Sequence, residues 1–273
     1  MIRIGHNPNT NMLPMFYYLP RKHPLLHWVT AEPTGHNAML ADGRIDLAPI
    51  SSFAYAQHAD AYAVLPGLSV STKGTVGSIL LFSKVELSEL GGKTVALTSN
   101  SATSVHLTKI ILERFYGVKP RYVTMHGGLA EMFAVADAAL LIADMAIQGA
   151  MAEPDCLIID LGEEWLKQTG FSMTYSVWAY PKDLILKIPE EVLQVHNLLI
   201  DAKERALKNL EPLAQACSQM VGGQVDFWRR YFAQFHYNLD EELVAGLEYY
   251  YALCYEQGFL VKRPRLNIWP PNQ

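Results

Sequence analysis

The stretch Leu65-Pro-Gly-Leu-Ser-Val-Ser-Thr-Lys-Gly-Thr-Val-Gly-Ser-Ile-Leu-Leu-Phe-Ser-Lys84 places hydroxyl groups and glycines directly before a run of apolar residues. The β-branched and aromatic residues at 79–82 predict a buried strand, so Gly77 and Ser78 should lie where a loop enters that strand. Glycine lets a ligand approach the backbone closely, and serine can donate a hydrogen bond to it. The stretch therefore predicts either a ligand-facing loop at the edge of a core or an ordinary loop followed by a strand.

Length and composition favour a compact globular protein. The chain has 273 residues, of which 50% are hydrophobic and 18% are charged, so it can form one large domain or two smaller ones. Its net charge of -5 and the lack of a Lys/Arg stripe argue against a nucleic-acid partner. The sequence has no signal-peptide pattern and no apolar stretch long enough to cross a bilayer, so we expect a cytoplasmic protein with no membrane partner.

Short apolar stretches alternate with helical patterns over the first 180 residues or so, which predicts an α/β fold. From residue 189 onward the pattern is helical, and an extended tail is expected over 263–273. The predicted strands cover 2–5, 25–29, 45–48, 79–82, 94–98, 122–125, 139–143 and 157–161. The predicted C-terminal helices cover 189–210, 213–220, 225–235 and 240–257.

The order of these elements predicts two lobes. A second α/β unit begins near residue 85 and ends near residue 176, as if it were inserted into the first. The first lobe would then contain 1–84 and 177–273, including the helical tail, and the second lobe would contain 85–176. Ligands of such folds bind where strands end and helices begin, so we expect the site there.

Three predicted strands run into polar turns that open helices. Ser51 and Ser52 follow the first, Ser101, Thr103 and Ser104 follow the second, and Asp144 follows the third. Side chains of these types cap helices by accepting hydrogen bonds from free backbone N–H groups. Helix N-termini also attract carboxylates, so the same residues are candidates for binding an anionic ligand.

The loop His6-Asn-Pro-Asn-Thr-Asn11 offers amides and a hydroxyl after the first strand, although it is also an ordinary turn sequence. Pro14 fits the first turn of a helix after that loop. The nine histidines and three cysteines lack metal-ligand spacing, so we predict no metal site and reduced cysteines. Fingerprints for nucleotide, dinucleotide and hydrolase chemistry are also missing, so no cofactor is predicted.

Several of these segments, taken in order, resemble the chorismate dehydratases of the futalosine route to menaquinone. The resemblance covers the first two thirds of the chain and little of the helical tail. Its main motifs are Ile4-Gly-His-x-Pro-x-x-Asn11, Gly43-Arg-Ile-Asp-Leu-Ala-Pro-Ile-Ser-Ser-Phe-Ala-Tyr55, Leu65-Pro-x-Leu-Ser-Val-Ser71, Val76-Gly-Ser-Ile-Leu-Leu-Phe-Ser-Lys84, Lys93-Thr-Val-Ala-Leu-Thr98, Ser101-x-Thr-Ser104, Ala138-Ala-Leu-Leu-Ile-Ala-Asp144 and Asp160-Leu-Gly-Glu-Glu-Trp165.

The resemblance implies a two-lobed fold like that of type II periplasmic binding proteins, with mixed sheets flanked by helices and a helical C-terminal segment. It also implies the conversion of chorismate, a small anion, to 3-[(1-carboxyvinyl)oxy]benzoate and water. The residues that the family implicates in catalysis fall on Asn11 and Ser78. The chain departs from the family at Asn9 and Thr10, where apolar residues are usual, so the detailed shape of the pocket is left open.

On this basis we expect Asn11 to position the ring hydroxyl or a carboxylate, and Ser78 to assist proton transfer or orient the leaving hydroxyl. His6, Asp144 and a carboxylate of the substrate are the candidate bases. The predicted substrate contacts are Ser51, Ser52, Gly77, Ser101, Thr103, Ser104 and Asp144, and the oligomeric state is left open.

Two other functions fit a similar fold. A solute receptor would bind a small anion without chemistry, but the missing signal sequence argues against it. The related 1,4-dihydroxy-6-naphthoate synthases usually carry a Ser-Pro-Cys-Pro-Asn-like first loop, and the first loop of this chain lacks that cysteine. The dehydratase is therefore the preferred prediction.

Overall fold

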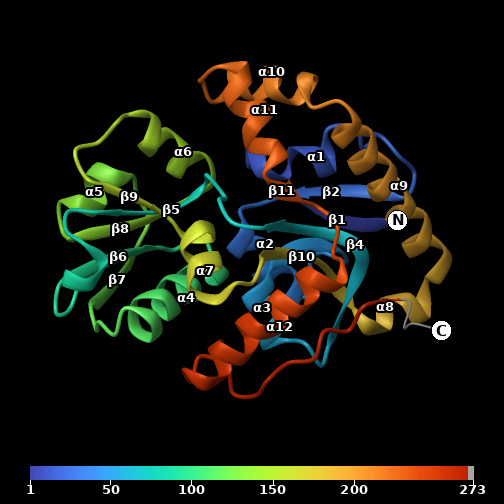
Figure 1. The fold of residues 1–273 in the computed structure, drawn as a ribbon. Helices are drawn as coiled ribbons and strands as arrows, with labels where there is room; N and C mark the ends of the chain where they lie inside the picture. The colour runs from blue at the N-terminus through green and yellow to red at the C-terminus, as the bar shows by residue number, and fades with distance from the viewer. Residues whose placement is uncertain (270–273) are drawn as a thin grey trace.

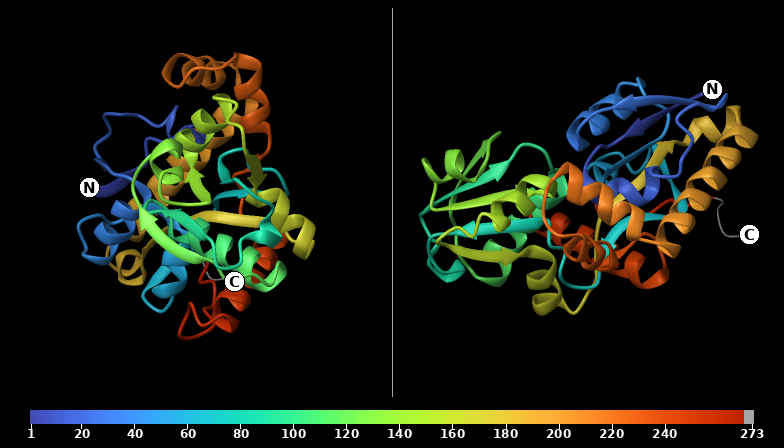
Figure 2. Two further views of the ribbon diagram at one scale, coloured as in Figure 1. Left: turned by 90° about the vertical axis from the view of Figure 1, so that its left-hand side faces the viewer. Right: turned by 90° about the horizontal axis from the view of Figure 1, so that it is seen from above.

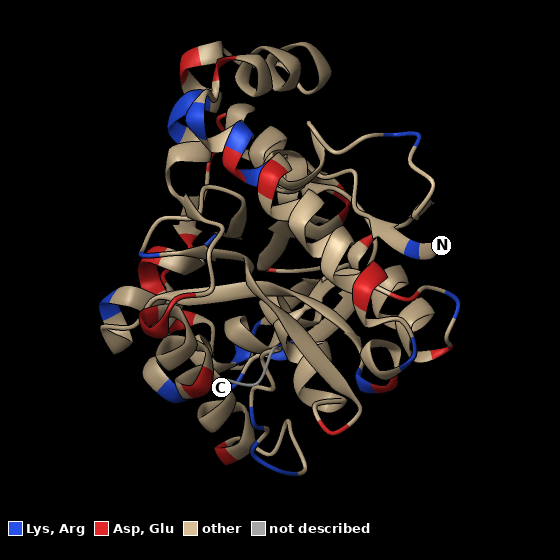
Figure 3. Ribbon diagram, turned by 90° about the vertical axis from the view of Figure 1, so that its right-hand side faces the viewer, with Lys and Arg blue, Asp and Glu red and all other residues tan. Residues whose placement is uncertain are grey.

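The computed structural model of the chain describes residues 1–269, which form two lobes joined side by side (Figure 1). The view from above in Figure 2 separates the lobe built on the five-stranded sheet from the rest of the molecule. This two-lobed α/β architecture with mixed sheets confirms the predicted fold class. No helix within residues 1–269 is both long enough and apolar enough to cross a membrane. On the face shown in Figure 3, basic and acidic segments are interspersed.

The second lobe is built on a five-stranded sheet with the order β7-β6-β8-β5-β9. Apolar residues cover both faces of its central strands, because Leu80 and Phe82 pack into one hydrophobic cluster while Ile79 and Leu81 pack into another. The strands are β5 (Ile79–Ser83), β6 (Thr94–Thr98), β7 (Arg121–Met125), β8 (Ala138–Ile142) and β9 (Leu157–Asp160), and the helices are η2 (Leu87–Glu89), α4 (Ala102–Ile110), η3 (Ile111–Phe115), α5 (Leu129–Phe133), α6 (Ala143–Met151) and α7 (Leu161–Thr169).

The first lobe contains a parallel pair, β1-β2, and a four-stranded sheet with the order β11-β4-β10-β3. Its strands are β1 (Ile2–His6), β2 (Leu26–Thr30), β3 (Ala48–Ser51), β4 (Tyr62–Thr72), β10 (Met173–Pro181) and β11 (Phe235–His236). Its helices are η1 (Thr10–Met12), α1 (Leu13–Phe16), α2 (Pro33–Ala41), α3 (Ser52–Gln57), α8 (Lys182–Lys187), α9 (Pro189–Lys208), α10 (Glu211–Met220), α11 (Val225–Ala233) and α12 (Glu241–Glu256).

Most predicted elements are confirmed within a residue or two, including the four C-terminal helices and Pro14 in the first turn of α1. The strand predicted over 45–48 was placed too early, because β3 begins at Ala48, where pairing with β10 starts. Asn267 and Trp269 pair with Val64 of β4, which confirms an extended tail over its described part. Residues 270–273 of the predicted tail lie outside the described residues.

Strand β4 was missed, because Pro66 and Gly67 interrupt its pattern. The register between β4 and β10 shifts at this point. Two side chains of α9 donate hydrogen bonds to the backbone carbonyls there, His196 to Pro66 O at 2.8 Å and Lys203 to Gly67 O at 2.7 Å. The hydroxyls that were read as part of a loop are instead buried on this strand, where Ser71 bonds Thr174 of β10 at 2.9 Å.

The boundary predicted after residue 84 differs from the observed strand pairing. Strand β5 pairs with β8 and β9, so it belongs to the five-stranded sheet, while all of β10 pairs with β3 and β4. We propose that residues 1–72 and 173–269 form the first lobe and residues 79–169 the second. The chain then crosses between the lobes at 73–78 and 170–172.

The first crossing is anchored by the carboxylate of Asp160, at the end of β9. This group accepts hydrogen bonds from the backbone N–H groups of Val76 and Gly77 in the crossing, at 3.0 and 2.6 Å. It also accepts from Gly162 and Glu163, at 2.9 and 3.0 Å, and so caps helix α7. The start of α7 lies close against the crossing segment, because a Cβ atom on Gly162 would lie 2.3 Å from the carbonyl oxygen of Gly74.

Replacing this carboxylate should weaken the joint between the lobes. We expect Asp160→Ala to lower the free energy of unfolding by about 2–4 kcal/mol, since it removes a helix cap and two further charge-assisted bonds. Asp240→Ala is the matched control, because Asp240 caps α12 through Leu243 N alone; it should cost about 1 kcal/mol. Urea unfolding of both variants measures this, and equal losses would contradict the role given to Asp160.

Candidate active site

A cleft lies between the lobes, with walls from both. Within residues 1–269, its walls include no lysine, arginine or histidine. The apolar part comes from residues such as Pro49, Ile50, Val70 and Ile142. The polar walls are Asn7, Asn9, Asn11, Ser51, Tyr175 and Ser176 from the first lobe, Ser78 from the end of the first crossing, and Ser101 and Ser104 from the second lobe.

The first loop supplies three amides to this cavity. Asn7 is buried and accepts a hydrogen bond from the backbone N–H of Asn9 at 3.0 Å, which fixes the turn. The side-chain oxygen of Asn11 is buried and has no hydrogen-bond partner among the described residues. Buried polar atoms are nearly always bonded, so the position suits a donor such as a ligand hydroxyl.

Ser78 lies opposite, at the start of β5, and is 1% exposed. Its hydroxyl oxygen accepts a hydrogen bond from the hydroxyl of Tyr231 at 2.8 Å. Gly77, the residue before it, has a φ of +68°, which glycine adopts without strain. Gly77 is not among the residues that line the cavity, and its N–H donates to Asp160.

Ser51 and Ser101 each cap a helix and also line the cavity. Ser51 caps α3 by accepting from Ala54 N at 3.2 Å, and Ser101 caps α4 by accepting from Ser104 N at 3.1 Å. The Ser101 hydroxyl also donates to that of Ser104 at 2.8 Å. All three serines line the cavity, so the N-terminus of α4 presents hydroxyls and a positive dipole end to a ligand.

Ser52 and Thr103 lie away from the cavity, although both were predicted to contact the substrate. Their hydroxyl oxygens lie 3.1 Å apart. Each also lies within hydrogen-bond distance of a backbone carbonyl of β10, Ser52 of Thr174 O at 2.7 Å and Thr103 of Tyr175 O at 3.2 Å. Both are fully buried. They join the starts of α3 and α4 to β10 and so hold the two lobes in register.

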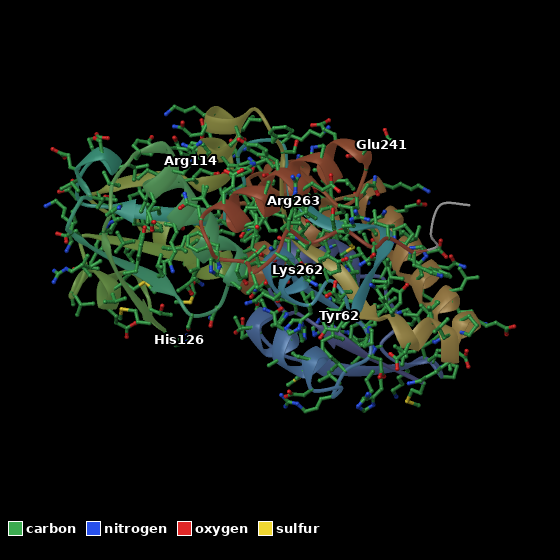
Figure 4. All side chains as sticks on the ribbon, turned by 90° about the horizontal axis from the view of Figure 1, so that it is seen from below. Tyr62, Arg114, His126, Glu241, Lys262 and Arg263 are labelled. Atoms are coloured by element: carbon green, nitrogen blue, oxygen red, sulfur yellow. The ribbon has the colours of Figure 1, made fainter. Side chains whose placement is uncertain are left out.

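Asp144 lines a second hollow that adjoins the cavity at Asn9, together with Glu32 and His126, which Figure 4 labels. Thr10 of the first loop donates to one Asp144 oxygen through both its N–H and its hydroxyl, a contact that crosses from one lobe to the other. Burial raises the pKa of Asp144, and the Thr10 hydrogen bonds offset only part of that effect.

His6, the other candidate base, does not line the cavity. Its ring packs edge-on against Phe16 and Trp28, and its Nδ1 lies 3.1 Å from the hydroxyl of Thr30. Burial, aided by the positive charge of Arg21, lowers the pKa of His6 to about 4.

Sequence reasoning missed several residues of this site. Tyr175 and Ser176 line the cavity without having been singled out, and Tyr231 comes from the helical tail. Asn7 and Asn9, which also line it, belong to the loop whose amides were noted. Ala143 has a φ of +51°, unusual for alanine, and donates its N–H to Ser78 O at 2.7 Å. Only the amides of the first loop carried a usable sequence signal.

In the described part of the chain, no group of three or more acidic, histidine or cysteine side chains is placed to hold a metal.

The fold defines the class of protein: a two-lobed protein of the periplasmic-binding-protein fold, here with a cavity between the lobes. An alkanesulfonate-binding protein from Xanthomonas axonopodis pv. citri, solved with bound MOPS, superposes with a TM-score of 0.71 at 16% identity, covering 98% of this chain and 97% of that one. A protein from Archaeoglobus fulgidus superposes with a TM-score of 0.75 at 24% identity, covering 95% and 98%.

The sequence places the chain more narrowly. A family model described as "Menaquinone biosynthesis" matches residues 2–256, and the chain belongs to that family. A chorismate dehydratase from Thermus thermophilus is 33% identical over 254 residues, which cover 87% of this chain and 89% of the relative. The family match extends through the helical tail, beyond the motifs recognised from the sequence alone.

The raised pKa of Asp144 predicts a pH dependence of stability. An unfolded aspartate titrates near pH ~3.9. Because its folded-state pKa is higher, this group favours folding below that pH, and the advantage is lost as the pH rises through the folded value. We therefore expect Asp144→Asn, which keeps an acceptor for Thr10, to be more stable than the wild type at neutral pH, with the difference vanishing in acid.

Asp46→Asn is the matched control with the opposite sign. Burial raises the pKa of Asp46, but its bonds to Arg3 outweigh burial and the net shift is downward. This variant should be less stable than the wild type at neutral pH, and the deficit should shrink as the pH falls through the lowered pKa. Urea unfolding from neutral to acid pH measures the free energy of unfolding of both variants and of the wild type. A destabilised Asp144→Asn at neutral pH would contradict the effect assigned to burial.

Proposed function

We propose that this chain is a chorismate dehydratase, which converts chorismate to 3-[(1-carboxyvinyl)oxy]benzoate and water. The observation that carries the proposal is the 33% identity to a chorismate dehydratase over most of both chains. The cavity adds support, because it brings Asn11 and Ser78, the two residues expected to be catalytic, into one space.

The reaction requires the substrate to be positioned, and it depends less on strongly acidic or basic side chains. A ring proton and the ring hydroxyl leave together as water, and the cyclohexadiene becomes a benzene ring, so aromatisation supplies much of the driving force. The protein must hold one conformer of the substrate, stabilise the charge on the departing oxygen and keep bulk water out. Amides and hydroxyls inside a buried cavity can do all three.

Neutral groups would bind the substrate carboxylates. Ser101 and Ser104 at the N-terminus of α4, with Ser51 from the other lobe, are the proposed carboxylate contacts. Asn11 would accept from or donate to the ring hydroxyl, and Ser78 would contact the oxygen that leaves. Asp144 would not contact the substrate itself; it would position the first loop by accepting hydrogen bonds from Thr10.

A carboxylate of the substrate is the proposed base for the ring proton. His6 does not reach the cavity, and Asp144 lines the adjoining hollow, with one oxygen already engaged by Thr10. The ring proton would pass to the substrate carboxylate and then to the departing hydroxide, which completes the water that is released. Normal turnover of a substrate with that carboxylate masked as an ester would contradict this assignment.

The proposal is tested by incubating the purified protein with chorismate and following the products by chromatography with mass detection. We expect a product lighter than chorismate by one water, with the spectrum of a substituted benzoate. Intact chorismate that still protects the protein against heat would instead support a small-anion binding protein. Intact chorismate without such protection would contradict both functions.

Variants of the two central residues test the site. We expect Asn11→Ala and Ser78→Ala each to lower kcat by about 100-fold or more, as the loss of a hydrogen bond to the reacting atoms does in other enzymes. Ser218→Ala is the control, because Ser218 lies on α10 outside the cavity and bonds only Gly223 O. Full turnover in either cavity variant would remove that residue from the proposed mechanism.

A further inference from the structure

The helical C-terminal segment contacts both residues proposed to be catalytic. The hydroxyl of Tyr231, near the end of α11, donates to the hydroxyl oxygen of Ser78 at 2.8 Å, and the two residues are 153 positions apart. A few residues later, the hydroxyl of Tyr237 donates to the backbone carbonyl of Asn11 at 2.9 Å. Figure 2 shows α11 at the junction of the two lobes.

The Tyr231 ring is held firmly in this position. It packs edge-on against Trp228 and Phe235, with ring centroids 5.4 and 5.0 Å away. The crossing segment lies directly on the ring, since a Cβ atom on Gly77 would come within 3.4 Å of it. Tyr231 is 2% exposed, so solvent does not compete for its hydroxyl.

The direction of the hydrogen bond decides what Ser78 can do. The contact runs from the Tyr231 hydroxyl to the Ser78 oxygen. Burial raises the pKa of Tyr231 well above that of a free tyrosine, so its hydroxyl keeps the proton that this bond needs. The Ser78 oxygen then accepts from Tyr231 and must donate its own hydrogen elsewhere. The acceptor that the described residues offer is Val76 O at 3.5 Å, a long contact. The Ser78 hydrogen is therefore available to a ligand in the cavity.

We propose that Tyr231 is a positioning residue that holds Ser78 as a hydrogen-bond donor toward the oxygen that leaves the ring. This inference rests on the proposed dehydratase function and deepens it, because it favours the second of the two roles considered for Ser78. The serine keeps its own proton throughout. The ring proton goes to the base and then to the departing hydroxide, whose negative charge the Ser78 hydrogen bond stabilises until water forms.

Tyr231→Phe tests the proposal, because it removes one oxygen and leaves the packed ring. We expect kcat to fall about tenfold, the usual value of one such hydrogen bond, while KM changes less than about twofold. In a Ser78→Ala background the same change should alter kcat by less than about twofold, since Tyr231 acts through Ser78. Tyr55→Phe is the control: Tyr55 is also buried, but its hydroxyl donates to Arg265 O, away from the cavity.

The possible outcomes separate the two proposals. A wild-type protein that does not dehydrate chorismate would overturn the proposed function and this inference with it. An active wild type with an unchanged Tyr231→Phe variant would overturn the inference alone. An equal loss of kcat in the wild-type and Ser78→Ala backgrounds, or a loss matched by Tyr55→Phe and by a lower melting temperature, would reduce Tyr231 to a structural residue.

Discussion

The carboxylate of Asp160 is the contact on which the geometry between the lobes depends. It accepts hydrogen bonds from the backbone of the crossing segment at Val76 and Gly77, and it also caps α7. Ser78 is the next residue after this anchored pair, so its place in the cavity is set by a backbone contact made outside the cavity. A carboxylate that accepts several backbone N–H groups makes charge-assisted hydrogen bonds, which are roughly twice as strong as neutral ones.

The site is assembled from distant parts of the chain. The first loop supplies amides, and the helix starts of both lobes supply serines. The C-terminal segment donates hydrogen bonds to Ser78 and to the backbone of Asn11. Neutral groups line the cavity throughout, which suits a reaction driven by aromatisation, because such a reaction needs a fixed substrate and a stabilised leaving oxygen. The bond from Thr10 to Asp144 spans the cleft and would have to form or break as the lobes close and open.

The sequence predicted the elements whose patterns are local. The apolar run of β5 and the helices after residue 189 were readable because their periodicity is strong. Strand β4 was missed because Pro66 and Gly67 interrupt it and side chains of α9 compensate from far away. Ser51 and Ser52 could not be told apart either: neighbouring residues at a helix start face different surroundings, and only the fold decides which one reaches the cavity. Tyr231 carries no local signal, since its role depends on a contact across 153 positions.

The most direct test of this account is a crystal structure of the Ser78→Ala variant soaked with chorismate. We expect intact chorismate between the lobes, with its ring hydroxyl facing residue 78 and Asn11 and a carboxylate at the start of α4 beside Ser101 and Ser104. Chorismate bound elsewhere, or oriented with its ring hydroxyl away from residue 78, would contradict the assignment of the cavity as the site of dehydration.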